Sequence, residues 1–373
     1  MYYRNDSLVV KLFKLDWNLI LAIFLLFLSG VVMLYSAAGG NFKPWAYKQV
    51  MYFFIFFPVM LGIAVIDINK WFKVSYIIYG AALLLLIMVT VKGYKSMGAV
   101  RWIRFGVFNL QPSEIMKLCL VLALAKYFEN LDSDDIKKTS AILIPIFLII
   151  IPVILIIKQP DLGTSLIVFA IGIALLFLTG IQMWKFNIAG ILGVIGVPFV
   201  WRFLMHDYQR RRILTFINPG SDPLGAGYNI TQSKIAIGSG GFLGKGYLKG
   251  TQGQLDFLPE KQTDFIFTML AEEFGFLGGF AVLVVCSYIL YKGIKIGLGA
   301  TTHYGRMVAL GIMTIFFLHM FINIAMAMGL IPVVGAPLPL LSYGGTITAT
   351  MLISFGFLLN IDLYKNTILI KKN

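Results

Sequence analysis

The stretch GTQGQLDFLPEKQTDFIFTMLAEE, residues 250–273, marks the point where a polar loop gives way to an apolar run. It closes a loop of about 60 residues, 205–264, in a chain that is otherwise mostly apolar. Asp264 lies two residues before the apolar run, where we expect the loop to become a helix. A carboxylate at this position is held at a fixed depth beside a bilayer surface. Asp264 is therefore the leading candidate for acid/base chemistry.

The composition predicts an all-α polytopic membrane protein. Hydrophobic residues make up 59% of the 373 residues, 13% are charged and the mean hydropathy is +0.85, values far from those of a soluble domain. A transmembrane helix needs about 20 apolar residues. About ten runs qualify, near 17–38, 46–66, 74–92, 112–128, 140–157, 163–180, 184–204, 265–291, 307–330 and 347–363. We therefore expect a single membrane domain, 1–373, with a large loop between helices 7 and 8.

The Lys and Arg residues predict how the chain is oriented in the membrane. Short cytoplasmic loops carry an excess of these residues. With ten helices both termini face one side, and that side has more Lys and Arg than the opposite side. We therefore expect both termini in the cytoplasm and the 205–264 loop outside the cell. The first apolar run is not followed by a cleavage site and a soluble region, so it is interpreted as a retained helix.

Two cationic clusters on the expected outer face depart from this rule. Arg101 and Arg104 lie close to Lys92 and Lys95, and Arg210 and Arg211 lie between Arg202 and Arg212. Arginine and lysine both suit phosphate oxygens, so the clusters favour a ligand that carries phosphate. The alternative is contact with anionic headgroups or with nearby acids. Trp102, between the two arginines of the first cluster, is either an interfacial aromatic residue or a wall of a substrate groove.

Two similar motifs introduce charge at the outer ends of apolar spans. In QPSEIMK, Glu114 and Lys117 are three residues apart, so they share one face of a helix. Such a pair is costly in lipid unless it faces a polar cavity, although Glu114 also suits a helix N-terminus. In QPDLGTS, Asp161 is a second candidate acid or, alternatively, the cap of the next helix. The histidines His206, His303 and His319 show no metal-ligand spacing, and Cys119 and Cys286 are interpreted as packing residues.

The other irregular segments suggest ligand contacts. The 205–264 loop is rich in Gly, Ser and Pro, and residues 230–237 are predicted to form a short amphipathic helix at the membrane surface. GSGGFLGKG does not match the spacing of a phosphate-binding loop. The uncharged segment IPVVGAPLPLLSYGGT, which follows the ninth span, is expected to dip into the bundle and line a cavity.

The role of Asp264 depends on its environment. If Thr263 caps the eighth helix, Asp264 lies in the first turn, where the helix dipole lowers the pKa and weakens the carboxylate as a base. Burial would raise the pKa instead. If the effect of the dipole is the larger one, Asp264 is a metal ligand or a hydrogen-bond acceptor rather than a base. Glu260, Asp256, Glu272 and Glu273 are competing acids, and a structural pairing of Glu272 and Glu273 with nearby bases is equally plausible.

Taken together, QPSEIMK, QPDLGTS, NPGSDPLGAGYNITQSKIAIGSGG, GKGYLKGTQGQLDFLPEKQTDFIF, LAEEFGFLGG and PVVGAPLPLLSYGG resemble the SEDS family of bacterial peptidoglycan glycosyltransferases. The resemblance covers nearly the whole chain, and PVVGAPLP favours the branch that acts in cell elongation. It implies an enzyme of the bacterial cytoplasmic membrane that polymerises lipid II. It also implies a class B penicillin-binding protein as partner, further membrane proteins of the elongation complex, contact with membrane lipid, and no nucleic acid.

The resemblance also assigns candidate residues. It places the essential aspartate at Asp264 and its supporting cavity residues at Glu114 and Lys117, with Trp102 as the important tryptophan. Further candidate substrate-binding residues are Arg101, Arg104, Asp161, Arg210, Arg211, Gln232, Lys245 and Glu260. A general base is expected to contribute about 10²- to 10⁴-fold to attack by a sugar hydroxyl, and direct displacement inverts the anomeric centre.

The leaving diphosphate needs nearby positive charge. Lys117 and the arginines of the two clusters are candidates, and so is a divalent cation, Mg²⁺ or Mn²⁺, held by Asp264, Glu114 or Asp161. The rival functions are a lipid II flippase or transporter and a non-catalytic scaffold. A transporter is expected to carry charge near the midplane within inverted repeats, whereas these acids lie near the outer ends of the spans.

Overall fold

The computed structural model describes residues 7–367 and 369, apart from 93, 97–98, 106–107, 137, 206, 219, 221 and 223–224. His206 lies outside these residues, as do the side chains of Lys92, Lys95 and Arg104. Ten helices coincide with the ten predicted spans: α2 (Trp17–Ala37), α3 (Trp45–Val65), α4 (Ile68–Lys92), α5 (Pro112–Glu129), α7 (Ser140–Ile157), α8 (Leu162–Leu178), α9 (Met183–Phe199), α13 (Ile266–Gly299), α14 (His303–Ala327) and α15 (Gly345–Leu363).

Eight helices in the described part of the chain are long and apolar enough to cross a membrane. The other two predicted spans are α8, a shorter apolar helix, and α5, which carries the charged residues Glu114, Lys117, Lys126 and Glu129. Charge in α5 is tolerated because this helix lies inside the bundle and most of its residues are buried. The chain is thus mostly helical, with the helices of a multi-pass membrane protein.

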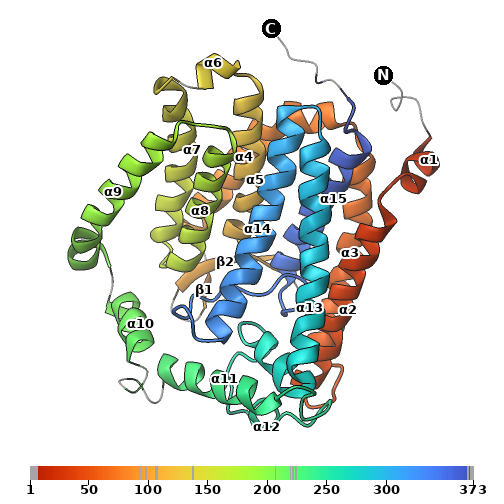
Figure 1. The fold of residues 1–373 in the computed structure, drawn as a ribbon, viewed down its shortest axis with the longest axis vertical. Coiled ribbons are helices and arrows are strands. Elements are labelled where there is room, and N and C mark those ends of the chain that lie inside the picture. The colour runs from red at the N-terminus through yellow and green to blue at the C-terminus, as the bar shows by residue number, and fades with distance from the viewer. Residues whose placement is uncertain are drawn as a thin grey trace.

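The bundle has a buried centre and one helix apart from it. Almost all of α15 is buried, against α3 on one side and α5 and α14 on others. By contrast, no residue of α9 is buried, and the helix stands at the edge of the bundle (Figure 1). A π-helical turn, η1 (Val200–Leu204), continues α9 toward the large loop.

The two ends of the bundle differ in structure. Both termini lie at one end, together with the short helix α6 (Ser133–Ile136) (Figure 1). The opposite end carries α10 (Asp207–Ile217), α11 (Ala226–Gly240) and α12 (Thr251–Gln254), all from the 205–264 loop. Helix α11 contains the predicted 230–237 helix and packs on α13. A further short helix, α1 (Leu8–Phe13), precedes α2.

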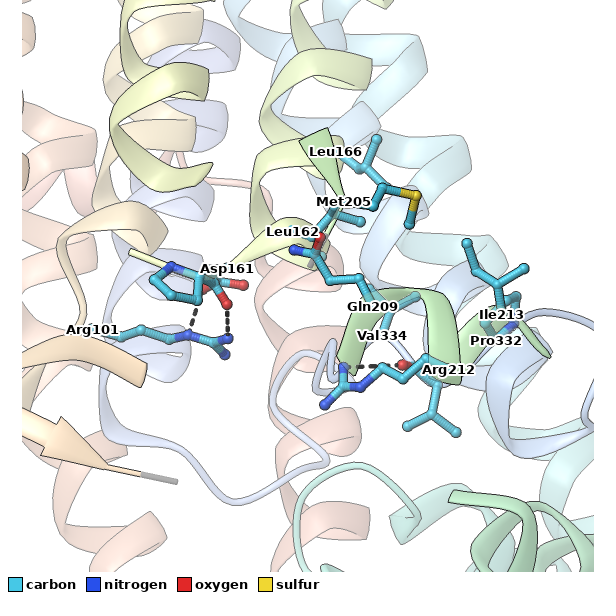
Figure 2. Close-up of a pocket in the computed structure, with 13 residues that line it drawn as sticks. Arg101, Asp161, Leu162, Leu166, Met205, Gln209, Arg212, Ile213, Pro332 and Val334 are labelled. Atoms are coloured by element: carbon cyan, nitrogen blue, oxygen red, sulfur yellow. Dashed lines mark hydrogen bonds and ion pairs between the residues drawn. The ribbon is translucent and has the colours of Figure 1, made fainter. Parts of the chain in front are cut away.

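A small sheet departs from the all-α prediction. Strands β1 (Tyr94–Ser96), β2 (Ala99–Phe105) and β3 (Phe108–Leu110) form an antiparallel ribbon in the order β1-β2-β3. The ribbon uses the aromatic and β-branched residues around Trp102, which pairs with Tyr94. It brings Arg101 to the end of the bundle that carries the large loop (Figures 1 and 2).

The segment 331–344 has the irregular backbone that its Pro and Gly content predicts, and much of it is buried. Gln49 of α3 holds its second half, because Nε2 of Gln49 donates to Leu340 O (3.3 Å) and Ser342 O (3.2 Å). We call residues 331–344 the inserted loop. These bonds satisfy part of its polar backbone inside the protein, as burial requires.

Candidate active site

Asp264 lies in a turn just before α13 and is fixed through its backbone. Its N–H donates to Glu260 O (3.1 Å), and its carbonyl accepts from Nδ2 of Asn323 on α14 (3.0 Å). The next residue, Phe265, occupies the N-cap position, so α13 begins at Ile266. The backbone of Asp264 is therefore held by two separate parts of the chain.

The expected Thr263 cap is not formed. The hydroxyl of Thr263 donates to the carboxylate of Glu260 (3.1 Å) and does not reach the first turn of α13. The Glu260 carboxylate also accepts from Nε2 of Gln262 (3.2 Å). Thr263 therefore does not take the capping role that the sequence left open, because its hydroxyl is bonded to Glu260, a residue in a left-handed conformation with φ of 54°.

The Asp264 carboxylate is half-buried against the inserted loop. A Cβ placed on Gly335 would lie 3.6 Å from Asp264 Oδ2, which shows how closely the loop backbone approaches. No N–H or O–H group of the described residues donates to this carboxylate. The pKa of Asp264 is raised to about 6, first by burial and then by the Glu260 carboxylate, while Arg212 opposes the rise. The carboxylate is thus free to accept a proton near neutral pH.

Glu114 and Lys117 form a buried pair on α5. Lys117 Nζ donates to Glu114 Oε1 (2.7 Å) and also contacts Nε2 of His319 on α14. The side chains of all three residues are less than one tenth exposed. A charge pair at this depth is stable because each partner is satisfied. The ammonium group of Lys117 is already neutralised in this arrangement.

The inserted loop connects this buried pair to Asp264. His319 Nδ1 donates to Pro337 O (3.2 Å), and Asn323 Nδ2 donates to Ala336 O (2.8 Å) as well as to Asp264 O. Ser342 Oγ donates to Thr263 O (2.6 Å). Asp264 and the pair of Glu114 and Lys117 therefore share one set of supports.

A cavity of about 190 Å³ lies between α8, α10 and the inserted loop (Figure 2). Its walls are mostly apolar side chains, with Arg101 and Arg212 on different sides. Arg101 contacts Pro160 O and forms an ion pair with Asp161 (Nε to Oδ2, 3.6 Å), while Arg212 Nη1 donates to Val333 O (3.2 Å). One arginine from each predicted cluster thus reaches the same cavity.

Asp161 caps α8, which confirms the capping interpretation of this residue. Its carboxylate accepts from Thr164 N (3.2 Å) and Thr164 Oγ1 (2.9 Å). It also accepts from Nε2 of Gln111 (3.3 Å), so the two Gln-Pro motifs meet in space. The capping role leaves room for substrate contact, since Asp161 also lines the cavity.

The other predicted substrate-binding residues lie in different settings. Arg210 turns back onto its own segment, with Nη2 donating to Arg202 O (2.9 Å), whereas Arg211 is exposed. Gln232 is half-buried on α11, and Lys245 binds Glu272 (2.8 Å). Trp102 is half-buried in β2 next to Arg101.

Of the competing acids, Glu272 has the structural pairing with a base that was one of its two interpretations, whereas Glu273 has no basic partner among the described residues. Besides Lys245, Glu272 accepts from Thr251 Oγ1 (3.1 Å) and from Gln252 N (3.0 Å). Glu273 binds the hydroxyl of Ser36 on α2. Both side chains are buried and hold residues 245–254 against α13.

The acids present offer little support for a divalent cation. Among the described residues there is no group of three or more His, Cys, Asp or Glu side chains that could hold a metal ion. Of the predicted ligands, Glu114 is paired with Lys117, and Asp161 with Arg101 and Thr164. Asp264 is left with Glu260 as its acidic neighbour. The donor set does not fit a metal site built by the protein alone.

Two residues of this site were missed as site residues in the sequence. His319 carries no ligand spacing, and Asn323 is a single polar residue in an apolar run. The signal that could have found them is their separation of four residues, which places both on one face of α14. Arg212 belongs to the second cationic cluster, but the sequence predicts Arg210 and Arg211 from that cluster as candidate substrate-binding residues.

The fold and site define a multi-pass membrane protein with a half-buried acid and a cavity that both adjoin the inserted loop. The sequence profile of the FtsW/RodA/SpoVE family, described as "Cell cycle protein", matches residues 16–367. The chain belongs to this family, the SEDS family that its motifs resemble.

Individual relatives agree with this assignment. The chain is similar to "Peptidoglycan glycosyltransferase MrdB" of Escherichia coli (40% identical over 354 residues, 94% of each chain). It is also similar to "Stage V sporulation protein E" of Bacillus subtilis (37% identical over 359 residues, 94% of this chain and 97% of the relative).

Solved structures extend the similarity to the fold. A structure described as "Structural coordination of polymerization and crosslinking by a peptidoglycan synthase complex" matches with a TM-score of 0.83 at 29% identity, covering 95% of this chain and 99% of that chain. The crystal structure of the rod shape determining protein RodA of Thermus thermophilus matches with a TM-score of 0.72 at 25% identity, with the same coverage.

Proposed function

We propose that this protein is a peptidoglycan glycosyltransferase that polymerises lipid II into glycan strands during cell elongation. The observation that carries the proposal is the Asp264 carboxylate, which lies just before α13 and against the inserted loop, with its backbone fixed and with a pKa raised to about 6. The names of the relatives, including a peptidoglycan glycosyltransferase at 40% identity, support the same activity.

Asp264 is the proposed general base. The 4-hydroxyl of an acceptor GlcNAc loses its proton to the Asp264 carboxylate as its oxygen attacks the anomeric carbon of MurNAc. The bond from that carbon to the diphosphate oxygen breaks, and undecaprenyl diphosphate leaves with the electron pair. A pKa near 6 keeps the base ionised at neutral pH and still able to accept a proton in the transition state. One displacement inverts the anomeric centre.

Arg101 and Arg212 are the proposed partners of the leaving diphosphate. They reach one cavity from different elements, and its mostly apolar lining strengthens the interaction of the half-buried Arg101 with developing charge. Lys117 is proposed to act by position rather than by direct contact, since its ammonium group already contacts Glu114 and His319. Trp102, Arg104, Arg210, Arg211, Gln232, Lys245 and Glu260 stay proposed contacts of the sugars or peptides.

The proposal includes a location and an orientation. Residues 1–373 form one membrane domain in the cytoplasmic membrane of a bacterium, with both termini in the cytoplasm and Asp264 on the outer side. The location of both termini at the end opposite to α10, α11 and α12 supports this orientation (Figure 1).

A class B penicillin-binding protein is the proposed partner, with other membrane proteins of the elongation complex. The likeness to a peptidoglycan synthase complex that coordinates polymerisation and crosslinking supports such a partner.

Labelled lipid II tests the function directly. Purified protein, with and without its penicillin-binding partner, is incubated with the substrate, and the products are separated by size. Ladders of glycan support the proposal. Labelled lipid that moves between leaflets of a vesicle without any ladder would identify the protein as a flippase.

A further inference from the structure

Helix α14 carries two polar side chains one turn apart that face the two halves of the site. His319 contacts Lys117, and Asn323 contacts the backbone of Asp264. Both side chains also donate to adjacent carbonyls of the inserted loop, those of Pro337 and Ala336. The two residues are at most 1% exposed, so neither is available to the substrate directly.

The chemistry of its partners fixes the protonation of His319. A carbonyl oxygen can only accept a hydrogen bond, so Nδ1 of His319 carries its proton toward Pro337 O. An ammonium group can only donate, so Nε2 accepts from Lys117. The ring is therefore neutral and in a single tautomer. It links the Lys117 side chain to the backbone of the inserted loop.

Asn323 links the backbone of Asp264 to the inserted loop. Its Nδ2 group donates to Asp264 O (3.0 Å) and to Ala336 O (2.8 Å), which uses both of its protons. Its Oδ1 atom is buried and accepts no hydrogen bond from the described residues. A buried polar side chain with one unsatisfied atom is costly, which indicates that the two donated bonds are the reason for an amide at this position.

We propose that His319 and Asn323 are positioning residues, which set the separation of Asp264 from the pair of Glu114 and Lys117 by clamping the inserted loop between them. This inference rests on the proposed function. A rigid loop keeps the base within reach of the acceptor hydroxyl, and a displacement of about 1 Å can lower a rate by roughly 100-fold.

The test uses paired substitutions. His319→Phe keeps an aromatic ring and removes both polar contacts, whereas His319→Gln retains one acceptor for Lys117 and one donor for Pro337 O. Asn323→Leu removes both donated bonds. Thr314→Val is the matched control on α14, because the Thr314 hydroxyl donates within its own helix to Leu310 O (2.9 Å).

Kinetics with labelled lipid II give the first measurement. We expect His319→Phe and Asn323→Leu to lower kcat by roughly 100-fold with KM within about threefold, and His319→Gln to recover to within about tenfold of wild type. Thr314→Val should behave as wild type. A kcat for both His319→Phe and Asn323→Leu within tenfold of wild type would overturn the proposal. A His319→Gln variant as inactive as His319→Phe would also overturn it.

Hydrogen exchange separates this inference from the proposed function. Amides of residues 331–344 should exchange faster in His319→Phe and in Asn323→Leu than in wild type or Thr314→Val. This result does not depend on whether the protein polymerises lipid II. Unchanged exchange in both variants would contradict the clamp even if activity fell. Faster exchange with no glycan from wild type would retain the clamp and reject the proposed function. If His319→Phe does not accumulate, Asn323→Leu is judged by the same two criteria.

Discussion

Two acids near the start of α13, the half-buried Asp264 and the buried Glu272, differ in what surrounds them. Glu272 is buried, but its carboxylate accepts from a lysine, a hydroxyl and a backbone N–H. The Asp264 carboxylate, eight residues earlier, accepts nothing from the described residues and has a pKa raised to about 6. A satisfied carboxylate stabilises structure, whereas an open one is available for a proton. Sequence position alone does not distinguish them.

The largest expected effect is on catalysis at Asp264. Asp264→Asn keeps the shape and removes the basic oxygen, so we expect glycan polymerisation to fall by about 10²- to 10⁴-fold while the protein accumulates normally. Labelled lipid II measures the rate. Asp256→Asn is the matched control, because Asp256 lies in the same loop with its side chain 82% exposed. Wild-type polymerisation by Asp264→Asn would remove Asp264 from the mechanism.

A buried pair should respond differently from an open acid. Lys117→Met leaves the Glu114 carboxylate buried without its cation, which typically costs about 3–5 kcal/mol. We expect a large fall in thermal stability in detergent, and a partial recovery when Glu114→Gln is added. Equal stability of the wild type and the Lys117→Met variant would show that the pair is more open to water than its burial indicates.

The comparison also predicts that Glu272 acts on stability rather than on chemistry. Glu272→Gln removes the charge that holds Lys245, and we expect a loss of about 1–3 kcal/mol in the free energy of unfolding. The surviving folded protein should polymerise at nearly the wild-type rate. A stable but inactive Glu272→Gln variant would place this acid in the mechanism and weaken the contrast.

The smallest expected effect has the opposite sign. The pKa of Asp264 is raised in the folded state, so its ionised form opposes folding above about pH 6, and this penalty disappears below the unfolded value near 3.8. One pKa unit corresponds to about 1.4 kcal/mol. Because the carboxylate is partly open to water, we expect Asp264→Asn to gain on the order of 1 kcal/mol. Its Tm should exceed that of wild type at pH 8 and match it near pH 4.

The sequence predicts most of this fold because apolar runs determine spans. All ten predicted runs coincide with helices, and the Pro and Gly content of 331–344 correctly indicated irregular backbone inside the bundle. The sheet around Trp102 was missed, because three short strands produce no strong periodicity. Helix α13 continues to Gly299, beyond its predicted end at residue 291. Lys292 and Lys295 end the apolar run there but do not end the helix.

The site could be predicted less completely. Motifs predicted Asp264, Glu114 and Lys117 as site residues, but the environment of each depends on residues distant in sequence. His319 is 202 residues from Lys117, and Asn323 is 59 from Asp264. Contacts of this kind come from packing, which single-sequence periodicity does not contain.

The most direct test of an open base at Asp264 is the pH dependence of kcat/KM for lipid II polymerisation. A raised pKa means that the base is protonated and inactive below about pH 6. We therefore predict a plateau above that value and a fall approaching tenfold per pH unit below it. A rate that stays flat between about pH 5 and pH 8 would contradict the account, because an ordinary or depressed pKa would then describe the catalytic group.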